Sequence, residues 1–105
     1  MNFPLTTKLS GVSHGDCQDN IKQFGCPDTC FYALIRESDN PYDVSAIAVT
    51  LGNVWHMGFI PNKLAKELSP LMDAGREFNA EFVCWNEHPA KDLVGLTVRI
   101  VETIS

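Results

Sequence analysis

The sequence has few basic residues for its length. Eight Lys and Arg stand against 13 Asp and Glu in 105 residues, so the formal net charge is -5. A protein with this charge repels a polyanion at long range. The composition therefore argues against broad, sequence-blind coating of nucleic acid. Any contact with nucleic acid has to be small and local.

The sequence also lacks a long apolar run. No segment approaches the roughly 20 consecutive apolar residues that a membrane-spanning helix needs. The first residues read MNFPLTTKLSGVSHGD, and they show neither the basic segment nor the continuous apolar segment of an export signal. We therefore expect a soluble, cytoplasmic protein that makes no contact with a membrane.

Nothing in the sequence divides the chain. It contains no internal repeat, no low-complexity run and no long linker, and 45% of its residues are hydrophobic. This length is close to the common size of a domain and supplies enough apolar material for one core. Residues 1–105 are therefore expected to form a single domain.

Cysteines are too few and too unevenly placed for a secreted disulfide framework, so reduced thiols are expected. One spacing nevertheless deserves a second interpretation, because His14-x2-Cys17 and Cys26-x3-Cys30 supply four soft ligands in two close pairs, as a tetrahedral zinc site needs. The separation between the pairs is short, and Cys is also a common small core residue. We favour plain burial, expect no cofactor, and keep zinc as the alternative.

The pattern of apolar residues predicts six strands and one or two short helices. Alternation and branched or aromatic residues indicate strands, whereas Leu64, Leu68 and Leu71 recur at helical spacing. Strands are expected at residues 5–12, 29–37, 46–51, 54–60, 77–85 and 93–104, and helices at 16–24 and 61–74. Pro70 would remove a backbone donor in mid-helix, so a second helical piece is expected to begin at Ser69–Pro70.

Turn signals link these strands into hairpins. Asp16 and Gly25 are expected to begin and end the first helix, and Gly75 to end the second. Gly52-Asn53 separates two apolar runs as a two-residue hairpin loop does, and NEHPAKD at 86–92 is a polar loop. Antiparallel connections without repeated strand-helix-strand alternation favour a small, mostly β barrel or sandwich. A six-stranded barrel of the oligonucleotide-binding (OB) type hides the edge strands most economically.

One loop carries a motif that turn chemistry does not explain. Asn and Pro suit a turn, but a turn does not call for the aromatic ring that stands between them and the next strand. The full motif is Asp39-Asn40-Pro41-Tyr42-Asp43-x-x-Ala46-Ile47-x-Val49, followed by Gly58-Phe59-Ile60-Pro61 and a Leu-Ala helix. This pattern resembles the HIRAN domain. The resemblance includes Lys8-Leu9-x-Gly11-Val12 and Gly95-Leu96-x-Val98-x-Ile100, so it covers essentially the whole chain.

The resemblance implies a nucleic-acid-binding module with a β-barrel related to OB folds. Such domains occur alone in bacteria or fused to helicase-like and nuclease modules, and the fused eukaryotic relatives capture the 3′ end of single-stranded DNA at stalled replication forks. By analogy, Tyr42 would stack on the terminal base, which is worth about 1–3 kcal/mol, and Asp43 would accept a hydrogen bond from the 3′-hydroxyl. The implied partners are single-stranded DNA ends and, in DNA repair or fork processing, helicase or nuclease proteins.

Other positions of this sequence depart from the family pattern. Ser13-His14 stands where the DNA-capturing relatives carry an Arg-aromatic pair, and His14 can still donate to a phosphate or stack. Pro61-Asn62 replaces basic residues and leaves Lys63 as the nearest cation. The predicted nucleic-acid-binding residues are Asn40, Tyr42, Asp43, His14, Phe59, Asn62, Lys63 and Trp85.

Several of these residues also have a purely structural interpretation. Tyr42 could pack on Leu34 or Ile60, and Asp43 could simply cap the turn. Trp85 could supply a second stacking ring or could pack in the core.

A second function class, a protein-interaction barrel without DNA affinity, fits the acidic charge, with Tyr42, Phe59 and Trp85 as anchors. Catalysis has little support. Cys84 and His88 flank a strand end, and no third group is placed to orient them. We expect no enzyme.

Overall fold

The fold is mostly β, as predicted. The computed structural model describes residues 3–12, 15, 17–24, 31–52, 55–88 and 93–103. Within these residues the chain forms six strands and two helices. They are β1 (Leu5–Lys8), α1 (Cys17–Phe24), β2 (Phe31–Arg36), β3 (Ile47–Leu51), β4 (Trp55–Phe59), α2 (Asn62–Asp73), β5 (Glu77–His88) and β6 (Leu93–Thr103).

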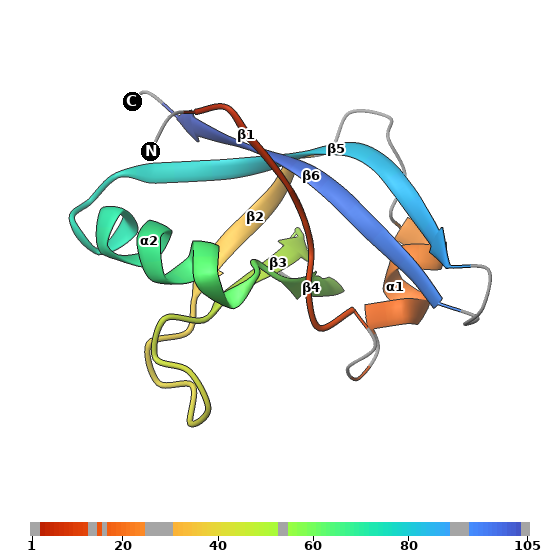
Figure 1. Ribbon diagram of the computed structural model, residues 1–105, viewed down its shortest axis with the longest axis horizontal. Coiled ribbons are helices and arrows are strands. Elements are labelled where there is room, and N and C mark those ends of the chain that lie inside the picture. Colours follow the sequence, from red (N-terminus) through yellow and green to blue (C-terminus); the bar gives the residue numbers. More distant parts are fainter. Residues whose placement is uncertain are drawn as a thin grey trace.

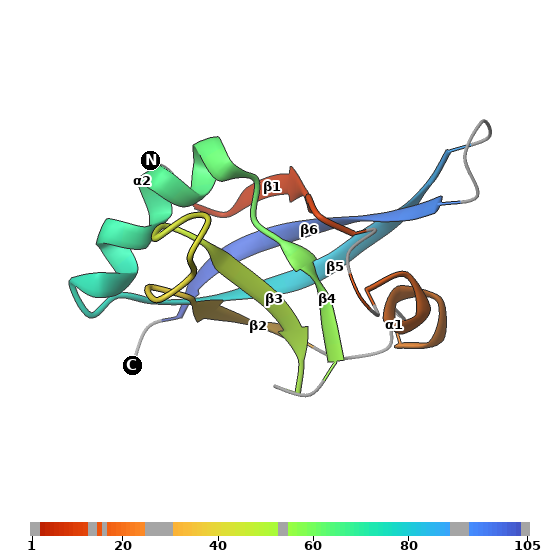
Figure 2. The same ribbon diagram turned by 90° about the horizontal axis from the view of Figure 1, so that it is seen from below.

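All six strands belong to one antiparallel sheet of order β1-β6-β5-β2-β3-β4. The sheet curls into a half-barrel, so that the segment after β1 comes beside the end of β4 (Figure 2). There the backbones of Ser10 and Phe59 exchange two hydrogen bonds, each of 2.8 Å. The predicted OB-like arrangement is confirmed as a half-barrel, in which the isolated bridge between Ser10 and Phe59 joins the segment after β1 to β4.

The inner face of the half-barrel holds the core. Leu96, Val98 and Ile100 of β6 alternate inward and are fully buried, whereas Arg99 between them is exposed. The two helices lie at opposite ends of the curled sheet (Figure 1), and each contributes a fully buried side chain, Ile21 from α1 and Leu68 from α2. Burying each such side chain stabilises the fold by about 1.5–3 kcal/mol. No helix among the described residues is long and apolar enough to cross a membrane.

The predicted break in the second helix is wrong. α2 is continuous from Asn62 to Asp73 and contains Pro70. The proline is exposed, and the backbone bond that it removes would have ended on the carbonyl of Lys66, another exposed position. Water can replace the missing donor on that side. The helix then ends as predicted, since Gly75 adopts a φ of 98° and its amide donates to the carbonyl of Met72.

Two strand boundaries also differ from the sequence prediction. β5 continues through Asn86 to His88, residues that were predicted to form a loop, because they pair with Gly95 to Leu93 of β6. Pairing with β6 thus makes these residues a strand in spite of their polar composition. β1 ends at Lys8 rather than at residue 12, although Leu9 still donates to the carbonyl of Leu96. The β3–β4 hairpin is confirmed by its pairing; Asn53, like Asp16 and Gly25, lies outside the described residues.

Two ion pairs between an arginine and a carboxylate join segments that are distant in sequence. Arg36 pairs with Asp73 at 3.0 Å, and Arg76 pairs with Glu102 at 2.6 Å. Hydrogen bonds from these arginines lower the pKa of each carboxyl below its ordinary value. Both carboxylates are therefore better stabilised in the folded chain than in the unfolded one.

Removing the Asp73 carboxylate is expected to reduce stability in a pH-dependent way. A lowered folded pKa gives a contribution that is complete above the ordinary Asp value of 3.8 and disappears as the pH falls through the folded value. Asp73→Asn should therefore unfold at a lower temperature than the wild type at pH 7, and the difference should vanish in strong acid. Thermal unfolding followed by circular dichroism measures it. Glu67→Gln, another exposed carboxylate of α2, is the control; equal effects would contradict the prediction.

A side chain at Gly58 is expected to disturb the closure of the sheet. An added Cβ would lie 3.0 Å from the Ser10 carbonyl oxygen and 3.1 Å from Val12 Cγ1. Gly58→Ala should therefore cost about 1–3 kcal/mol of unfolding free energy, measured by urea denaturation. Gly95→Ala is the matched control, since its nearest contact would be an ordinary 3.5 Å. A Gly58→Ala protein as stable as this control would show that the edges can separate freely.

Candidate functional site

The loop between β2 and β3 is held in shape by its own asparagine. Asn40 Oδ1 accepts hydrogen bonds from the backbone amides of Tyr42 and Asp43, at 2.8 and 3.1 Å. Its Nδ2 donates to Glu37 Oε1 at 3.0 Å. Asn and Pro thus build the corner predicted from turn chemistry. The amide group of Asn40 is occupied within the loop, so its evident contribution is to shape the loop.

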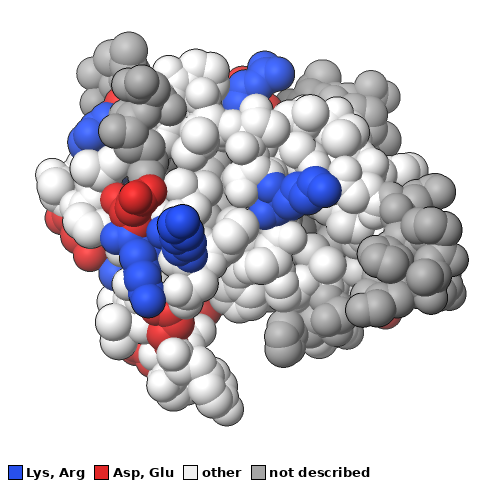
Figure 3. Space-filling view, in the orientation of Figure 1, with Lys and Arg blue, Asp and Glu red and all other residues white. Residues whose placement is uncertain are grey.

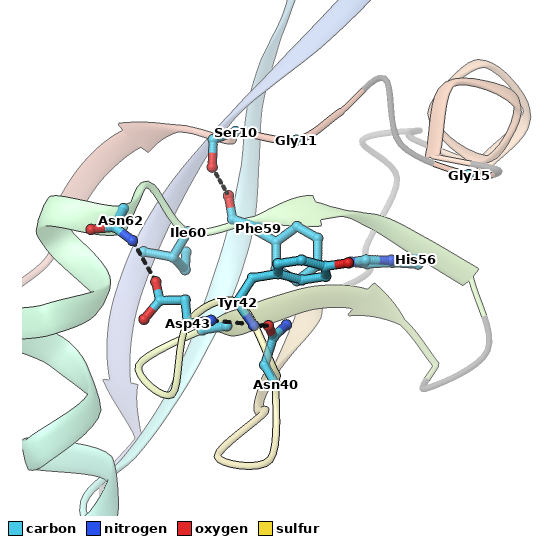
Figure 4. A pocket seen from close by; sticks show the side chains of 11 residues that line it. Ser10, Gly11, Gly15, Asn40, Tyr42, Asp43, His56, Phe59, Ile60 and Asn62 are labelled. Carbon is cyan, nitrogen blue, oxygen red and sulfur yellow. Dashed lines mark hydrogen bonds between the residues drawn. The ribbon is translucent and has the colours of Figure 1, made fainter.

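Asp43 makes two contacts that fix its carboxylate. Oδ1 accepts the backbone amide of Ser45 at 2.9 Å, which is the turn-capping role considered from the sequence. Oδ2 accepts a hydrogen bond from Nδ2 of Asn62, the first residue of α2 (Figure 4). Asp43 can therefore cap the turn with one carboxylate oxygen and still belong to the candidate site. The carboxylate is half-buried and directed toward the helix start.

Tyr42 is almost completely exposed, with 96% of its surface accessible. The alternative in which its ring packs on Leu34 or Ile60 is therefore wrong, because the loop corner carries the ring away from the sheet. The side chain stands at the edge of a hollow whose lining also includes Phe59 and His56 (Figure 4). An exposed ring contributes little to the core, and its flat face is available for stacking.

A hollow of about 710 Å³ lies beside Tyr42 and Asp43. Its walls come from the segment after β1, the β2–β3 loop, β4 and the start of α2. They are lined by Ser10, Gly11, Gly15, Asn40, Tyr42, Asp43, Ala46, His56, Phe59, Ile60 and Asn62. The structure thus brings together five of the eight predicted site residues. The closure of the sheet adds a further wall, because Ser10 lines the hollow and pairs with Phe59.

His56 is a lining residue that the sequence did not indicate. Its Nε2 lies 2.9 Å from the carbonyl oxygen of Gly58, which can only accept, so Nε2 carries a proton and donates. The imidazole ring packs edge to face against the ring of Phe59, with 4.6 Å between the ring centroids. Simple alternation would put these two residues on opposite faces of β4. The register of the pairing between β3 and β4, however, shifts between Val49 and Thr50. The resulting bulge turns both toward the hollow.

The hollow contains little charge. Among the described residues that line it, Asp43 is the only carboxylate, and none is Lys or Arg. Lys63 is exposed on α2 but does not line the hollow. Its helix begins after Pro61 without a side-chain cap, so the first backbone amides of α2 can receive an anion. On the face shown in Figure 3, Lys and Arg side chains are interspersed with Asp and Glu and with uncharged residues, and they form no continuous stripe.

The remaining predicted residues lie elsewhere. Trp85 is on β5, half-exposed, and its ring contacts Phe82 at 6.4 Å between centroids; it does not line the hollow. His14 lies outside the described residues, as do Cys26 and Cys30 of the zinc alternative, while Cys17 is buried. In the part of the chain that the structure describes, no three metal-ligating side chains gather. The site residues remain predictions.

The sequence of this chain matches a known domain family. The sequence profile of the HIRAN domain family matches residues 31–103, which include the β2–β3 loop, β4 and α2. The chain belongs to the HIRAN domain family. HIRAN domains are known as nucleic-acid-binding domains, and their role is binding rather than catalysis on their own.

Two solved structures resemble this HIRAN domain in fold. A crystal structure of a protein from Lactobacillus plantarum has a TM-score of 0.68 at 22% identity, with 91% of each chain covered. The HIRAN domain of human HLTF has a TM-score of 0.63 at 20% identity, covering 91% of this chain and 73% of that one. At these identities the likeness concerns the fold alone. A comparison with curated proteins gave no match.

Proposed function

We propose that this HIRAN domain binds the 3′ end of single-stranded DNA at the hollow beside the β2–β3 loop. The terminal base stacks on Tyr42, and the 3′-hydroxyl donates a hydrogen bond to Asp43. The observation that carries the proposal is the pairing of a ring that is 96% exposed with a carboxylate in the same hollow. Membership of the HIRAN family supports nucleic acid as the class of ligand.

The charge of the hollow favours an end over the middle of a strand. Asp43 repels a phosphate, and no Lys or Arg among the described lining residues offsets that repulsion. A terminal hydroxyl is uncharged and can donate to the carboxylate, so it fits where an internal phosphodiester does not. The phosphates of the preceding nucleotides lie outside the hollow in this arrangement, near the open amides of α2 and Lys63.

The cellular role proposed from the family is the processing of DNA ends. A domain that recognises a free 3′-hydroxyl can direct a helicase or nuclease partner to stalled forks or repair intermediates. The domain itself then acts by binding, in the cytoplasm.

Replacing the stacking ring is expected to weaken end binding without unfolding the domain. Tyr42→Ala should lower the affinity for a 5′-labelled 3′-hydroxyl oligonucleotide by about five- to 150-fold, since stacking is worth about 1–3 kcal/mol per base. Fluorescence anisotropy at low salt measures it. Val44→Ala is the matched control, because Val44 is 67% exposed on the same loop and does not line the hollow. Equal losses in both variants would contradict stacking.

The carboxylate is expected to set the preference for a free hydroxyl. Wild-type protein should bind a 3′-hydroxyl oligonucleotide about five- to 30-fold more tightly than the same strand with a 3′-phosphate, because charge repulsion at Asp43 costs about 1–2 kcal/mol. Asp43→Asn should reduce this ratio toward one, since an amide does not repel phosphate. Equal affinity of the wild type for both ends, or no binding at low salt, would contradict the proposed function.

A protein-interaction role is the second candidate, supported by the net charge of -5 and the hollow without lining cations. The two functions differ in their response to salt. If phosphates are bound, the logarithm of the association constant falls with the logarithm of the salt concentration, by about 0.7 per phosphate on a single strand. A zero slope, together with capture of a protein partner after nuclease treatment, would favour the second candidate.

A further inference from the structure

The β2–β3 loop, residues 37–46, holds the two groups on which the site depends, yet its hydrogen bonds to itself do not attach it to the rest of the molecule. Glu37 and Ala46 close its base, and the Asp43 carbonyl accepts the amide of Ala46 at 3.1 Å. These bonds give the loop its internal shape. Its orientation over the hollow needs contacts with another element.

Arg36 makes such contacts from the last position of β2. Its Nη1 donates to the backbone carbonyls of Val44 and Ala46, at 3.0 and 3.1 Å. Its Nε and Nη2 donate to the two carboxylate oxygens of Asp73, at 3.0 and 3.2 Å. One guanidinium group therefore joins the returning arm of the loop to the last residue of α2. The side chain of Arg36 is only 17% exposed, whereas that of its partner Asp73 is 58% exposed.

The geometry requires arginine rather than a positive charge alone. Four acceptors lie around one planar group, and two of them form the parallel fork that a guanidinium makes with a carboxylate. A lysine ammonium is a compact charge on a flexible stem, so it cannot hold the carbonyls and the carboxylate in this arrangement. Arg36 does not line the hollow, and its position at the end of an apolar strand did not mark it as functional.

We propose that Arg36 is a positioning residue for the site, which holds the β2–β3 loop so that Tyr42 and Asp43 stand ready at the hollow before a ligand arrives. This inference rests on the proposed function. A loop fixed in advance loses less conformational freedom on binding, so the affinity is higher. The second attachment, from Asp43 to Asn62 at the start of α2, fixes the tip of the loop while Arg36 fixes its base (Figure 4).

The test compares Arg36→Lys with Arg76→Lys. Arg76 forms the same kind of fork, with Nε and Nη2 on Glu102 at 2.6 and 2.8 Å, but this partner lies in β6 rather than in the loop. Thermal unfolding first establishes that both variants fold. Asp73→Asn, at a carboxylate that is 58% exposed, removes the charge at the other end of the fork and serves if Arg36→Lys does not fold.

Two measurements separate positioning from general stability. The first is amide hydrogen exchange without ligand at Ser45 and Ala46, which should become about tenfold faster in Arg36→Lys while core amides are unchanged. The second is the ratio of affinities for 3′-hydroxyl and 3′-phosphate oligonucleotides, which should fall at least threefold. Partial unfolding alone lowers the fraction of active protein but leaves this ratio unaltered. Arg76→Lys should change neither quantity.

Each other outcome overturns a defined part of the idea. Unchanged exchange in Arg36→Lys would show that Arg36 does not hold the loop, whatever the DNA results are. Faster exchange with an unchanged affinity ratio would show that the loop is held but that the site does not need it, and equal effects of Arg76→Lys would assign both changes to stability. A wild-type protein without preference for the hydroxyl end would overturn the proposed function, and the positioning role with it.

Discussion

The pair of backbone hydrogen bonds between Ser10 and Phe59 is the interaction on which the site depends. It joins the segment after β1 to the end of β4, which lie at opposite ends of the strand order. The chain can approach this closely because Gly58 has no side chain at the crossing. Directly after the crossing the chain enters α2, so the closure also sets where the helix begins. This one contact thus positions three walls of the hollow: the segment after β1, β4 and the start of α2.

Most of the fold could be predicted from the sequence because it follows from local patterns. Alternation, branched or aromatic residues and turn signals located the six strands, and the spacing of Leu64, Leu68 and Leu71 located α2. The errors arose where tertiary context overrides local preference. Pro70 is tolerated because it faces solvent, and the polar end of β5 is a strand because β6 pairs with it. Neither fact is visible in a window of neighbouring residues.

The site was predictable only in part, for a related reason. The ring of Tyr42 stood out because the turn around it does not require an aromatic residue, but its exposure is a property of the folded loop. His56 was hidden by a bulge, which no periodic pattern reveals. Arg36 was hidden because its partner Asp73 is 37 residues away along the chain. Side chains that build a site through distant contacts leave a weak signal in the sequence.

Helix α2 also acts as a spacer of fixed length between two attachments of the same loop. Its first residue, Asn62, bonds to Asp43, and its last, Asp73, bonds to Arg36. Twelve helical residues span about 18 Å, and each added or deleted residue rotates one end relative to the other by about 100°. A change in helix length would therefore detach one of the two contacts. The number of residues in α2 is therefore a structural constraint on the site, separate from the identity of its exposed side chains.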